Sequence, residues 1–513
     1  MTRIRALLVA LIALALAALA CGLPAASPTA VSVPPTRTPA PSPMLPPTAT
    51  PRPSPAPTET PLPSPTLLPL IGAEGAGDAY FPTMGNGGYD ALHYTLDLTV
   101  DLEAHTLDAT AILDAQAAQD LARFNLDLVG MQVEGVAVNG QPAHYERSRG
   151  ELIITPADLI GVGETFRVWV DYHGTPRGQA DMPDYSQGWH FYEGGAFVAG
   201  EPTGASGWYP VNMHPSDKAT YTFRVTVEKP YEVAANGTLR QSIDNGSTQT
   251  FVWESRDPIA PYLVTVGVGD FRIETDASTS GVPIRNYIAA SLSSDVIQAT
   301  ALQADMIDVY ESLFGPYPFE VSGVIVHDVR LQFALETQTL IVFGNSFIDE
   351  YVVAHELAHM WFGDSVTPAR WQDIWLNEGF ATYASLLWFE RAYSPKDAEQ
   401  ELRSMYEVMA GSGGNTIVIG DPGPDDMFDG AVYLRGALTL HALRLRVGDE
   451  VFFEVLRTYA DRYRHGNAAT EDFIALAEEV SGESLDDLFQ RWLYEAKMPD
   501  IPEMGLYAKD FAP

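Results

Sequence analysis

The stretch V-A-H-E-L-A-H-M-W-F-G-D occupies residues 353–364 and carries two histidines four positions apart, His355 and His359. Residues four apart share one face of an α-helix, so both imidazoles can reach a single metal ion. Glu356 is offset by one position, which places its carboxylate past the metal, where a general base must stand. The surrounding residues are apolar, and an apolar helix buries ionisable groups at a cost unless they are paired or metal-bound. The pattern therefore favours a metal-binding helix over an amphipathic helix with hydrogen-bonded histidines.

A second carboxylate follows at a suitable distance. Glu378 lies nineteen residues after His359, in the run W-Q-D-I-W-L-N-E-G-F-A-T-Y of residues 371–383, which we expect to form a second helix. Catalytic zinc takes three protein ligands and keeps one position open for water. We therefore predict one zinc ion per chain, bound by His355, His359 and Glu378.

Residues 353–364, together with W-L-N-E-G-F-A at 375–381, resemble the aminopeptidase N-like zinc metallopeptidases, the gluzincins with eighteen residues between the second histidine and the ligand glutamate. The resemblance covers roughly residues 80 to 500. It implies an N-terminal β-saddle, a thermolysin-like catalytic domain and removal of N-terminal residues from peptides. Tyr433, in V-Y-L-R-G-A, matches the family's tyrosine that hydrogen-bonds the oxyanion. Without the resemblance, a tyrosine in such a run is an ordinary aromatic.

The resemblance also implies two carboxylates that bind the free amino group of the substrate. Glu336 lies in F-A-L-E-T where the family has G-x-M-E-N, and Glu201 lies in A-G-E-P-T where the family has Q-x-E-P-T. A carboxylate binds an ammonium group through charge-assisted hydrogen bonds. The chain departs from the family pattern at Phe333, Thr337 and Ala199, and the alternative for each glutamate is a solvated surface carboxylate.

Composition restricts the class of protein. The chain has 513 residues, of which 46% are hydrophobic and 11% aromatic, as expected for a globular protein of two to four domains. Its net charge of −37 would repel phosphates and argues against nucleic acid as a partner. The acidity favours solubility, with attraction of basic peptides as the alternative.

The N-terminus is typical of a targeting segment. Arg3 and Arg5 precede an apolar stretch over residues 6–20, and Ala18-Leu19-Ala20 forms a cleavage site before Cys21, the only cysteine. The stretch resembles a bacterial lipoprotein signal, although Ala18 stands where leucine is preferred. We expect the protein on the extracellular side of a bacterial-type membrane, anchored by a lipid at Cys21. Ordinary secretion and an uncleaved anchor are the alternatives. One cysteine allows no internal disulfide.

The rest of the chain divides by pattern into an α+β multidomain protein. We expect a signal peptide at 1–20 and a stalk at 21–75, since residues 21–70 hold 17 of the 38 prolines. Alternating apolar residues predict a β-sandwich or saddle domain at 76–272, with strands around Tyr94 and Tyr221 and a hairpin at Asn139-Gly140. A strand is expected at 324–329. Helical spacing after residue 295, with a stop at Gly315, predicts a mixed domain that ends in helices at 273–513. The resemblance implies that this part is a thermolysin-like zinc peptidase domain with a helical tail.

Three functions are consistent with these features. The first is a zinc aminopeptidase acting on peptides, and the second is a zinc endopeptidase or another hydrolase of the same fold, which would not need Glu336 and Glu201. The third is a cell-surface binding module with a vestigial site, against which the retention of all the ligand, base and tyrosine positions argues. Residues 489–499 resemble the close of the family's catalytic unit, without the large helical domain that follows in many relatives. We therefore expect a more open cleft.

Overall fold

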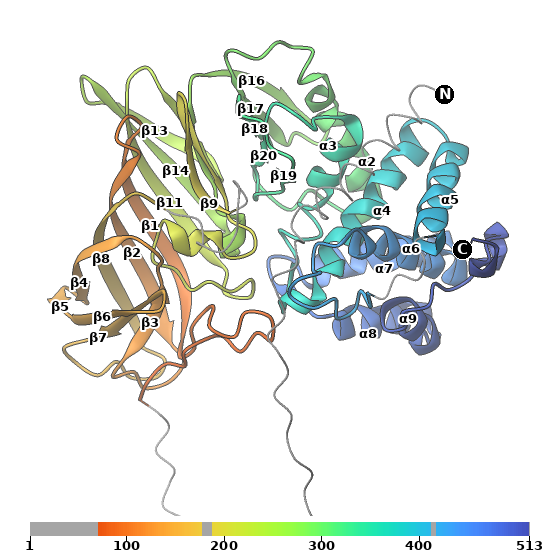
Figure 1. The fold of residues 1–513 in the computed structure, drawn as a ribbon, viewed down its shortest axis with the longest axis horizontal. Coiled ribbons are helices and arrows are strands. Elements are labelled where there is room, and N and C mark those ends of the chain that lie inside the picture. Colours follow the sequence, from red (N-terminus) through yellow and green to blue (C-terminus); the bar gives the residue numbers. More distant parts are fainter. Residues whose placement is uncertain (1–69, 177–186, 412–416, 512–513) are drawn as a thin grey trace, which may run out of the picture.

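The computed structural model describes residues 70–176, 187–411 and 417–511. Figure 1 shows the strand-rich N-terminal part on one side and the helices of the C-terminal part on the other, with a smaller sheet between them. The predicted α+β class with an N-terminal β-domain is confirmed. The signal segment, Cys21 and the stalk up to residue 69 lie outside the described residues.

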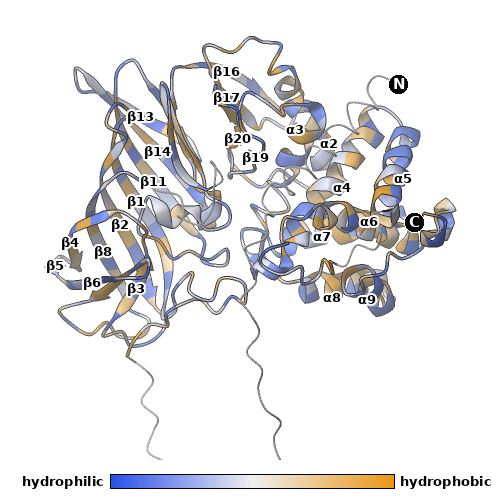
Figure 2. Ribbon diagram, in the orientation of Figure 1, coloured by the Kyte–Doolittle hydropathy of each residue, from blue (hydrophilic) through white to orange (hydrophobic). Residues whose placement is uncertain are grey.

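An eight-stranded sheet forms the largest part of the β-domain. Its order is β13-β14-β11-β1-β2-β8-β4-β5, and all neighbours are antiparallel except β1 and β11. The strands are β1 (Tyr89–Asp101), β2 (Thr106–Ala117), β4 (Gln132–Val138), β5 (Gln141–Pro142), β8 (Thr165–Gly174), β11 (Ala219–Glu228), β13 (Thr238–Asp244) and β14 (Thr248–Ile259). Buried and exposed positions alternate along β1, and Figure 2 shows matching hydrophobic and hydrophilic bands. The predicted strands at Tyr94 and Tyr221 lie in β1 and β11, at the centre of this sheet.

Turn chemistry fixes one hairpin of this sheet as expected. Asn139 and Gly140 join β4 to β5, and both have positive φ, 51° and 76°. Two successive residues with positive φ match the right-handed twist of the flanking strands, which is why Asn-Gly is favoured here.

Two smaller sheets complete the β-domain. One has the order β3-β7-β6 and the other β12-β15-β10-β9. Their strands are β3 (Phe124–Asp127), β6 (His144–Ser148), β7 (Glu151–Thr155), β9 (Gly188–Tyr192), β10 (Gly195–Ala199), β12 (Glu232–Ala235) and β15 (Val266–Gly269). All five residues of β10 are buried, and Glu201 follows its end by two residues. The second small sheet therefore leads directly to one predicted site residue.

A five-stranded sheet begins the second half of the molecule. Its order is β16-β17-β18-β20-β19, from β16 (Phe271–Ala277), β17 (Pro283–Ala289), β18 (Val324–Val326), β19 (Ala334–Leu335) and β20 (Ile341–Phe343). The predicted boundary between residues 272 and 273 falls inside β16, because β16 pairs with β17 rather than with the β-domain. The expected strand at 324–329 ends at Val326. Glu336 follows β19 directly.

Eight α-helices in the described residues follow or flank this sheet. They are α2 (Gln303–Phe314), α3 (Glu350–Ala358), α4 (Trp375–Ala392), α5 (Pro395–Gly411), α6 (Gly430–Val447), α7 (Asp449–Arg462), α8 (Thr470–Ser481) and α9 (Asp486–Leu493). A short two-stranded ladder joins β21 (Thr367–Pro368) to β22 (Asn467–Ala468). Helix α2 ends at Gly315, as predicted, where φ is 97°. No helix in the described part of the chain has the length and apolarity needed to span a bilayer.

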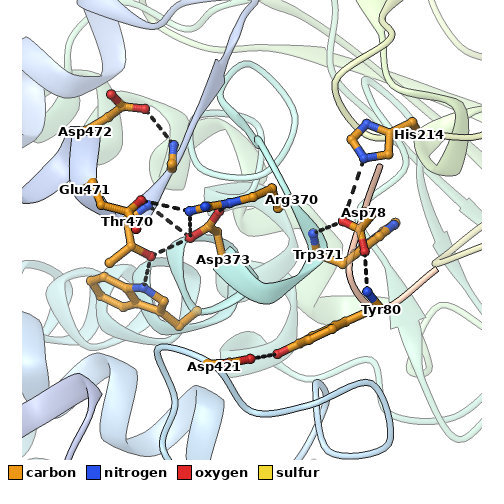
Figure 3. Close-up of polar contacts among 12 residues, drawn as sticks. Asp78, Tyr80, His214, Arg370, Trp371, Asp373, Asp421, Thr470, Glu471 and Asp472 are labelled. Atoms are coloured by element: carbon orange, nitrogen blue, oxygen red, sulfur yellow. Dashed lines mark hydrogen bonds and ion pairs between the residues drawn. The ribbon is translucent and has the colours of Figure 1, made fainter. Parts of the chain in front are cut away.

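A strap of residues 70–88 connects the β-domain to the catalytic half. Asp78 lies at its centre and accepts a hydrogen bond from the backbone N–H of Trp371 (2.9 Å), while His214 of the β-domain lies 3.7 Å from the same carboxylate oxygen. The Tyr80 hydroxyl donates to Asp421 (2.6 Å) and accepts from the N–H of Gly423 (2.7 Å). Figure 3 shows the contacts of Asp78 and the Tyr80–Asp421 hydrogen bond beside a second polar group around Asp373. The strap therefore bonds to segments from both halves of the molecule.

Candidate metal centre

Helix α3 carries the first part of the site. Asp349 caps its N-terminus by accepting a hydrogen bond from Val352 N–H (3.0 Å), and the helix continues to Ala358. His355 and Glu356 are buried within the last helical turn, and His359 forms the C-cap. The tertiary structure thus places the two histidines and the glutamate in one buried turn, as the spacing predicts.

Helix α4 supplies the second carboxylate. The expected helix over 371–383 divides into a 3₁₀ turn at Trp371–Asp373 and α4, which starts at Trp375 and continues to Ala392. Glu378 therefore lies in the first turn of α4. The following residue, Gly379, contacts Gly436 of α6 so closely that a Cβ on Gly379 would lie 2.8 Å from the Cα of Gly436. This crossing of two glycines brings α6 against the ligand-bearing end of α4.

The three predicted ligands converge on one point. The Nε2 atoms of His355 and His359 are 3.1 Å apart, and Glu378 Oε2 lies 3.3 Å from the first and 3.6 Å from the second. Ligands about 2.0–2.1 Å from a tetrahedral zinc ion are separated by roughly 3.3 Å, so these three edges fit one such ion. The donor set, two imidazoles and one carboxylate, is also that of a catalytic zinc site.

The other ring nitrogens of both histidines face protein oxygens. His359 Nδ1 lies 3.0 Å from the carbonyl oxygen of Phe362, and His355 Nδ1 lies 3.5 Å from Thr382 Oγ1. A protonated Nδ1 that donates to such an oxygen leaves the Nε2 lone pair free for a metal. Thr382 follows Glu378 by four residues, so the helical spacing could have indicated it.

The buried negative charges of the site also favour the binding of a cation. Four glutamates, Glu201, Glu336, Glu356 and Glu378, group around the two histidines. Burial lowers the pKa of His355 to about 4, which keeps the imidazole neutral and able to bind metal. Burial raises the pKa of the Glu378 carboxyl to about 8, against the opposing effects of His359 and of a hydrogen bond from Tyr433. A divalent cation at this point would favour the ionised carboxylates, which otherwise repel each other in a buried site.

Glu356 lies beside the three ligands. The residue is 6% exposed. A carboxylate oxygen of Glu356, a carboxylate oxygen of Glu336 and a ring nitrogen of His359 lie within 4.8 Å of one another. Burial raises the pKa of Glu356 well above its usual value, and the charges of Glu336 and Glu378 raise it further. The side chain is therefore a stronger base than a solvated glutamate.

Tyr433 reaches the same cluster from α6. Its ring stacks on the His355 imidazole with the centroids 6.0 Å apart. Burial raises the pKa of the Tyr433 hydroxyl, and the nearby carboxylates raise it further, so the hydroxyl stays protonated. Two residues later on α6, the buried Arg435 donates to carbonyl oxygens at the end of α9 and fixes the helix in place.

Glu201 and Glu336 form the remaining side of the site. Their carboxylates and that of Glu378 have oxygens within 4.8 Å of one another. Glu336 is 3% exposed, and the Oε1 atoms of both Glu201 and Glu336 are buried without a hydrogen-bond partner among the described residues. Burial, followed by the charge of Glu336, raises the pKa of Glu201. The structure thus brings all seven predicted site residues into one cluster.

This geometry agrees with sequence comparison. The model of the peptidase M1 N-terminal domain matches residues 90–263, and that of the peptidase family M1 domain matches residues 299–492. An M1 zinc metallopeptidase from Deinococcus radiodurans is 34% identical in sequence, with a TM-score of 0.79 over 83% of this chain and 98% of its own. The chain belongs to peptidase family M1. The resemblance drawn from the two motifs is confirmed, and the metal of the site is zinc.

Other M1 relatives include a solved structure that this chain covers almost completely and curated proteins that are longer than this chain. A variant of an M1 zinc metallopeptidase from Deinococcus radiodurans, solved with a Tyr-Ser-Ala substrate, is 33% identical, with a TM-score of 0.78 over 83% of this chain and 99% of its own. Among curated relatives, a glutamyl aminopeptidase of Bitis rhinoceros is 30% identical over 58% of this chain, and aminopeptidase M1-B of Oryza sativa subsp. japonica is 27% identical over 80%. This M1 chain spans 34% and 50% of the lengths of these two relatives.

Proposed function

We propose that this M1 protein is a zinc aminopeptidase that removes N-terminal residues from peptides. The observation that carries the proposal is the pair of buried carboxylate oxygens on Glu201 and Glu336 that lack a hydrogen-bond partner among the described residues. Carboxylate oxygens of these two residues and of the zinc ligand Glu378 lie within 4.8 Å of one another. Buried charges require compensation, and a substrate ammonium would supply it through charge-assisted hydrogen bonds.

The chain's own residues account for the chemistry of peptide hydrolysis. Zinc held by His355, His359 and Glu378 would act as a Lewis acid that lowers the pKa of water and polarises a carbonyl group. The Glu356 carboxylate accepts a proton from the attacking water and later delivers it to the nitrogen of the leaving amine. The protonated Tyr433 hydroxyl donates a hydrogen bond to the oxygen that becomes negative as the carbonyl carbon turns tetrahedral.

The position of the amine site determines where the substrate is cut. Carboxylate oxygens of Glu201, Glu336 and the zinc ligand Glu378 lie within 4.8 Å of one another. An ammonium group bound by the first two would therefore bring the first peptide bond of the substrate to the zinc. An acetylated terminus carries no positive charge and would leave both carboxylates buried without a cation. The geometry therefore favours an exopeptidase over an endopeptidase.

Hydrolysis of matched reporter substrates tests this proposal. Purified protein with one equivalent of zinc is assayed on aminoacyl reporters with free and with N-acetylated termini, and on a long peptide followed by mass spectrometry. We expect cleavage of the free substrates only, with stepwise loss from the N-terminus of the peptide. Cleavage of acetylated substrates, or internal cuts, would favour the endopeptidase alternative. Absence of hydrolysis with zinc bound would favour a vestigial site.

We also propose that the protein is a lipoprotein on the extracellular side of the membrane. The support is the sequence before the described residues: Arg3 and Arg5, the apolar residues 6–20, and Cys21 after a small-residue cleavage site. Mass spectrometry of the N-terminal peptide and membrane fractionation of Cys21→Ala test the proposal. A diacylglyceryl group on Cys21 and release of the variant are the expected results, whereas an unmodified Cys21 would contradict it.

A further inference from the structure

The turn after α3, residues 359–366, presses against the zinc ligand His359. Its backbone folds back on α3, with Asp364 N–H donating to the His359 carbonyl (2.9 Å). The carbonyl of Phe362 accepts from His359 Nδ1 (3.0 Å). At Gly363, where φ is 134°, a Cβ would lie 2.9 Å from His359 Nδ1, so only glycine fits there. The backbone of this turn therefore contacts both the carbonyl and the imidazole ring of His359.

The β-domain holds the outer side of the same turn. The Tyr262 hydroxyl, from the 3₁₀ turn Pro261–Leu263, donates to the carbonyl of Gly363 (2.8 Å). The ammonium group of Lys218, directly before β11, donates to the carbonyls of Asp364 and Ser365, both at 2.9 Å. The three carbonyls that follow Phe362 are thus all bound by side chains of the other domain.

Tyr262 also connects the turn to the second ligand helix. Its hydroxyl oxygen accepts a hydrogen bond from Asn377 Nδ2 (3.3 Å), and Asn377 directly precedes the ligand Glu378 on α4. Tyr262 is fully buried, and its ring packs edge-on against Trp371 at 5.1 Å between centroids. Removing the hydroxyl would leave the Gly363 carbonyl and the Asn377 amide without this partner in a buried site.

Lys218 contributes charge as well as hydrogen bonds. Neither carboxylate oxygen of Asp364 has a hydrogen-bond partner among the described residues, and the side chain is fully buried. Burial lowers the pKa of the Lys218 ammonium to about 7, and the charge of Asp364 opposes this effect. Burial raises the pKa of the Asp364 carboxyl well above its usual value and the charge of Glu336 raises it further, whereas the charge of Lys218 opposes both effects. Lys218 therefore partly offsets the cost of burying this carboxyl.

We propose that Tyr262 and Lys218 are positioning residues for zinc, which hold the turn at 362–365 so that Phe362 O orients His359. Partners of metal ligands tune affinity because they fix the ring and its tautomer. The inference rests on the zinc site and not on the aminopeptidase assignment, so each can fail without the other. It assigns the β-domain a part in metal binding in addition to its part in the amine site.

Zinc affinity of the full chain tests the proposal directly. Tyr262→Phe and Lys218→Met are compared with two controls: Tyr209→Phe removes a buried hydroxyl that pairs with Tyr221 inside the β-domain (3.1 Å), and Lys229→Met removes a surface ion pair with Asp244. The zinc dissociation constant is measured by competition with a chromophoric chelator. We expect it to rise about 10- to 100-fold in the first two variants and to stay within about 3-fold in the controls.

Two further measurements separate positioning from loss of folding. The visible spectrum of the Co²⁺-substituted protein reports the ligand geometry, and we expect it to change in Tyr262→Phe and Lys218→Met only. The unfolding temperature of the metal-free protein should fall no further in these variants than in Tyr209→Phe. Unchanged zinc affinity and an unchanged Co²⁺ spectrum in both variants would overturn the proposal. Equal losses of affinity in the Tyr209→Phe control would overturn it too, because they would indicate a general effect of stability.

Discussion

The site has two walls, which differ in the secondary structure that carries their side chains. The helical wall consists of side chains on α3, α4 and α6: His355, Glu356, His359, Glu378 and Tyr433. The strand wall consists of Glu201, which follows β10, and Glu336, which follows β19. In the helical wall the ligand atoms face one another at 3.1–3.6 Å, whereas each glutamate of the strand wall has a buried oxygen with no hydrogen-bond partner among the described residues.

The difference indicates a division of labour. The ligand atoms of the helical wall fit one zinc ion without a substrate, so we assign the reaction to the helical wall. Buried carboxylate oxygens without partners favour the binding of a cation, so we assign recognition of the substrate amine to the strand wall. If this division is correct, substitutions in the helical wall should affect kcat, and those in the strand wall should affect the preference for a free amine.

The largest expected effect is that of Glu356→Gln. This change removes the base but none of the three metal ligands, so kcat should fall about 100- to 10,000-fold while zinc stays bound. Steady-state kinetics together with metal analysis check this, with Glu407→Gln on the exposed face of α5 as control. Joint loss of zinc and activity would show that Glu356 is a ligand or a structural residue.

Removal of zinc by a chelator should abolish activity, and added zinc should restore it.

Tyr433→Phe should have the next largest effect within the helical wall. A donor aimed at the developing oxyanion acts mainly in the transition state, and its loss costs about 3 kcal/mol, or roughly 100-fold in kcat, with little change in KM. Tyr393→Phe, which removes a hydroxyl bound to Glu350, is the control. A kcat close to that of the unchanged protein would make Tyr433 an ordinary aromatic.

The strand wall is tested by Glu336→Gln and Glu201→Gln, which remove charge at nearly constant shape. Each should lower kcat/KM for substrates with free termini about 10- to 100-fold, with the larger loss at the more buried Glu336. Their activity on acetylated substrates should not fall, so the preference for a free amine should shrink. If both variants kept the full preference, the amine would bind elsewhere and the division between the walls would be wrong.

The smallest expected effect concerns stability and the strap. Burial alone would raise the pKa of Asp78, but the nearby His214 imidazole and hydrogen bonds from the backbone N–H groups of Trp371, Tyr80 and Phe81 outweigh it and lower the pKa to about 2. A carboxyl group with a lowered pKa in the folded state stabilises it fully above the unfolded pKa of 3.8, and this contribution is lost as the pH falls toward 2. Asp78→Asn should therefore lower the free energy of unfolding at pH 7 by about 1–2 kcal/mol.

Denaturant unfolding at pH 7 and at pH 3 measures this contribution. The difference between Asp78→Asn and the unchanged protein should be smaller at pH 3 than at pH 7. Asp97→Asn, which breaks an exposed ion pair with Arg224, serves as control and should cost less than about 1 kcal/mol. A pH-independent difference would mean that the carboxylate charge of Asp78 does not hold the strap.

Local sequence patterns predicted the helices, strands and turns whose conformation depends on residues close in the sequence. Alternation located β1 and β11, the Asn139-Gly140 dipeptide located its hairpin, and helical spacing with Gly315 located the end of α2. Very short elements were missed: β19 has two residues and β20 three, so neither shows a period, and the expected strand at 324–329 is reduced to β18. These strands form because neighbouring strands pair with them, which no local pattern reports.

The sequence by itself determined the metal-binding set of this protein. The spacing of His355 and His359 has a fixed geometrical meaning on a helix, and only a few residue types bind zinc, so these two and Glu378 could be chosen without a structure. Glu336 and Glu201 were found through a family resemblance, since a lone glutamate has no local signature.

Only the tertiary structure decided what surrounds that set. Tyr262 and Lys218 meet the turn after α3 across about 100 and 150 residues of chain, and Gly379 meets Gly436 at a helix crossing. Such contacts depend on long-range packing, between the two domains for Tyr262 and Lys218 and within the catalytic half for the two glycines. Any of many tyrosines, lysines or glycines could have met the site. The physical reason is that helix geometry fixes neighbours within a turn, whereas packing of the whole core fixes neighbours between elements.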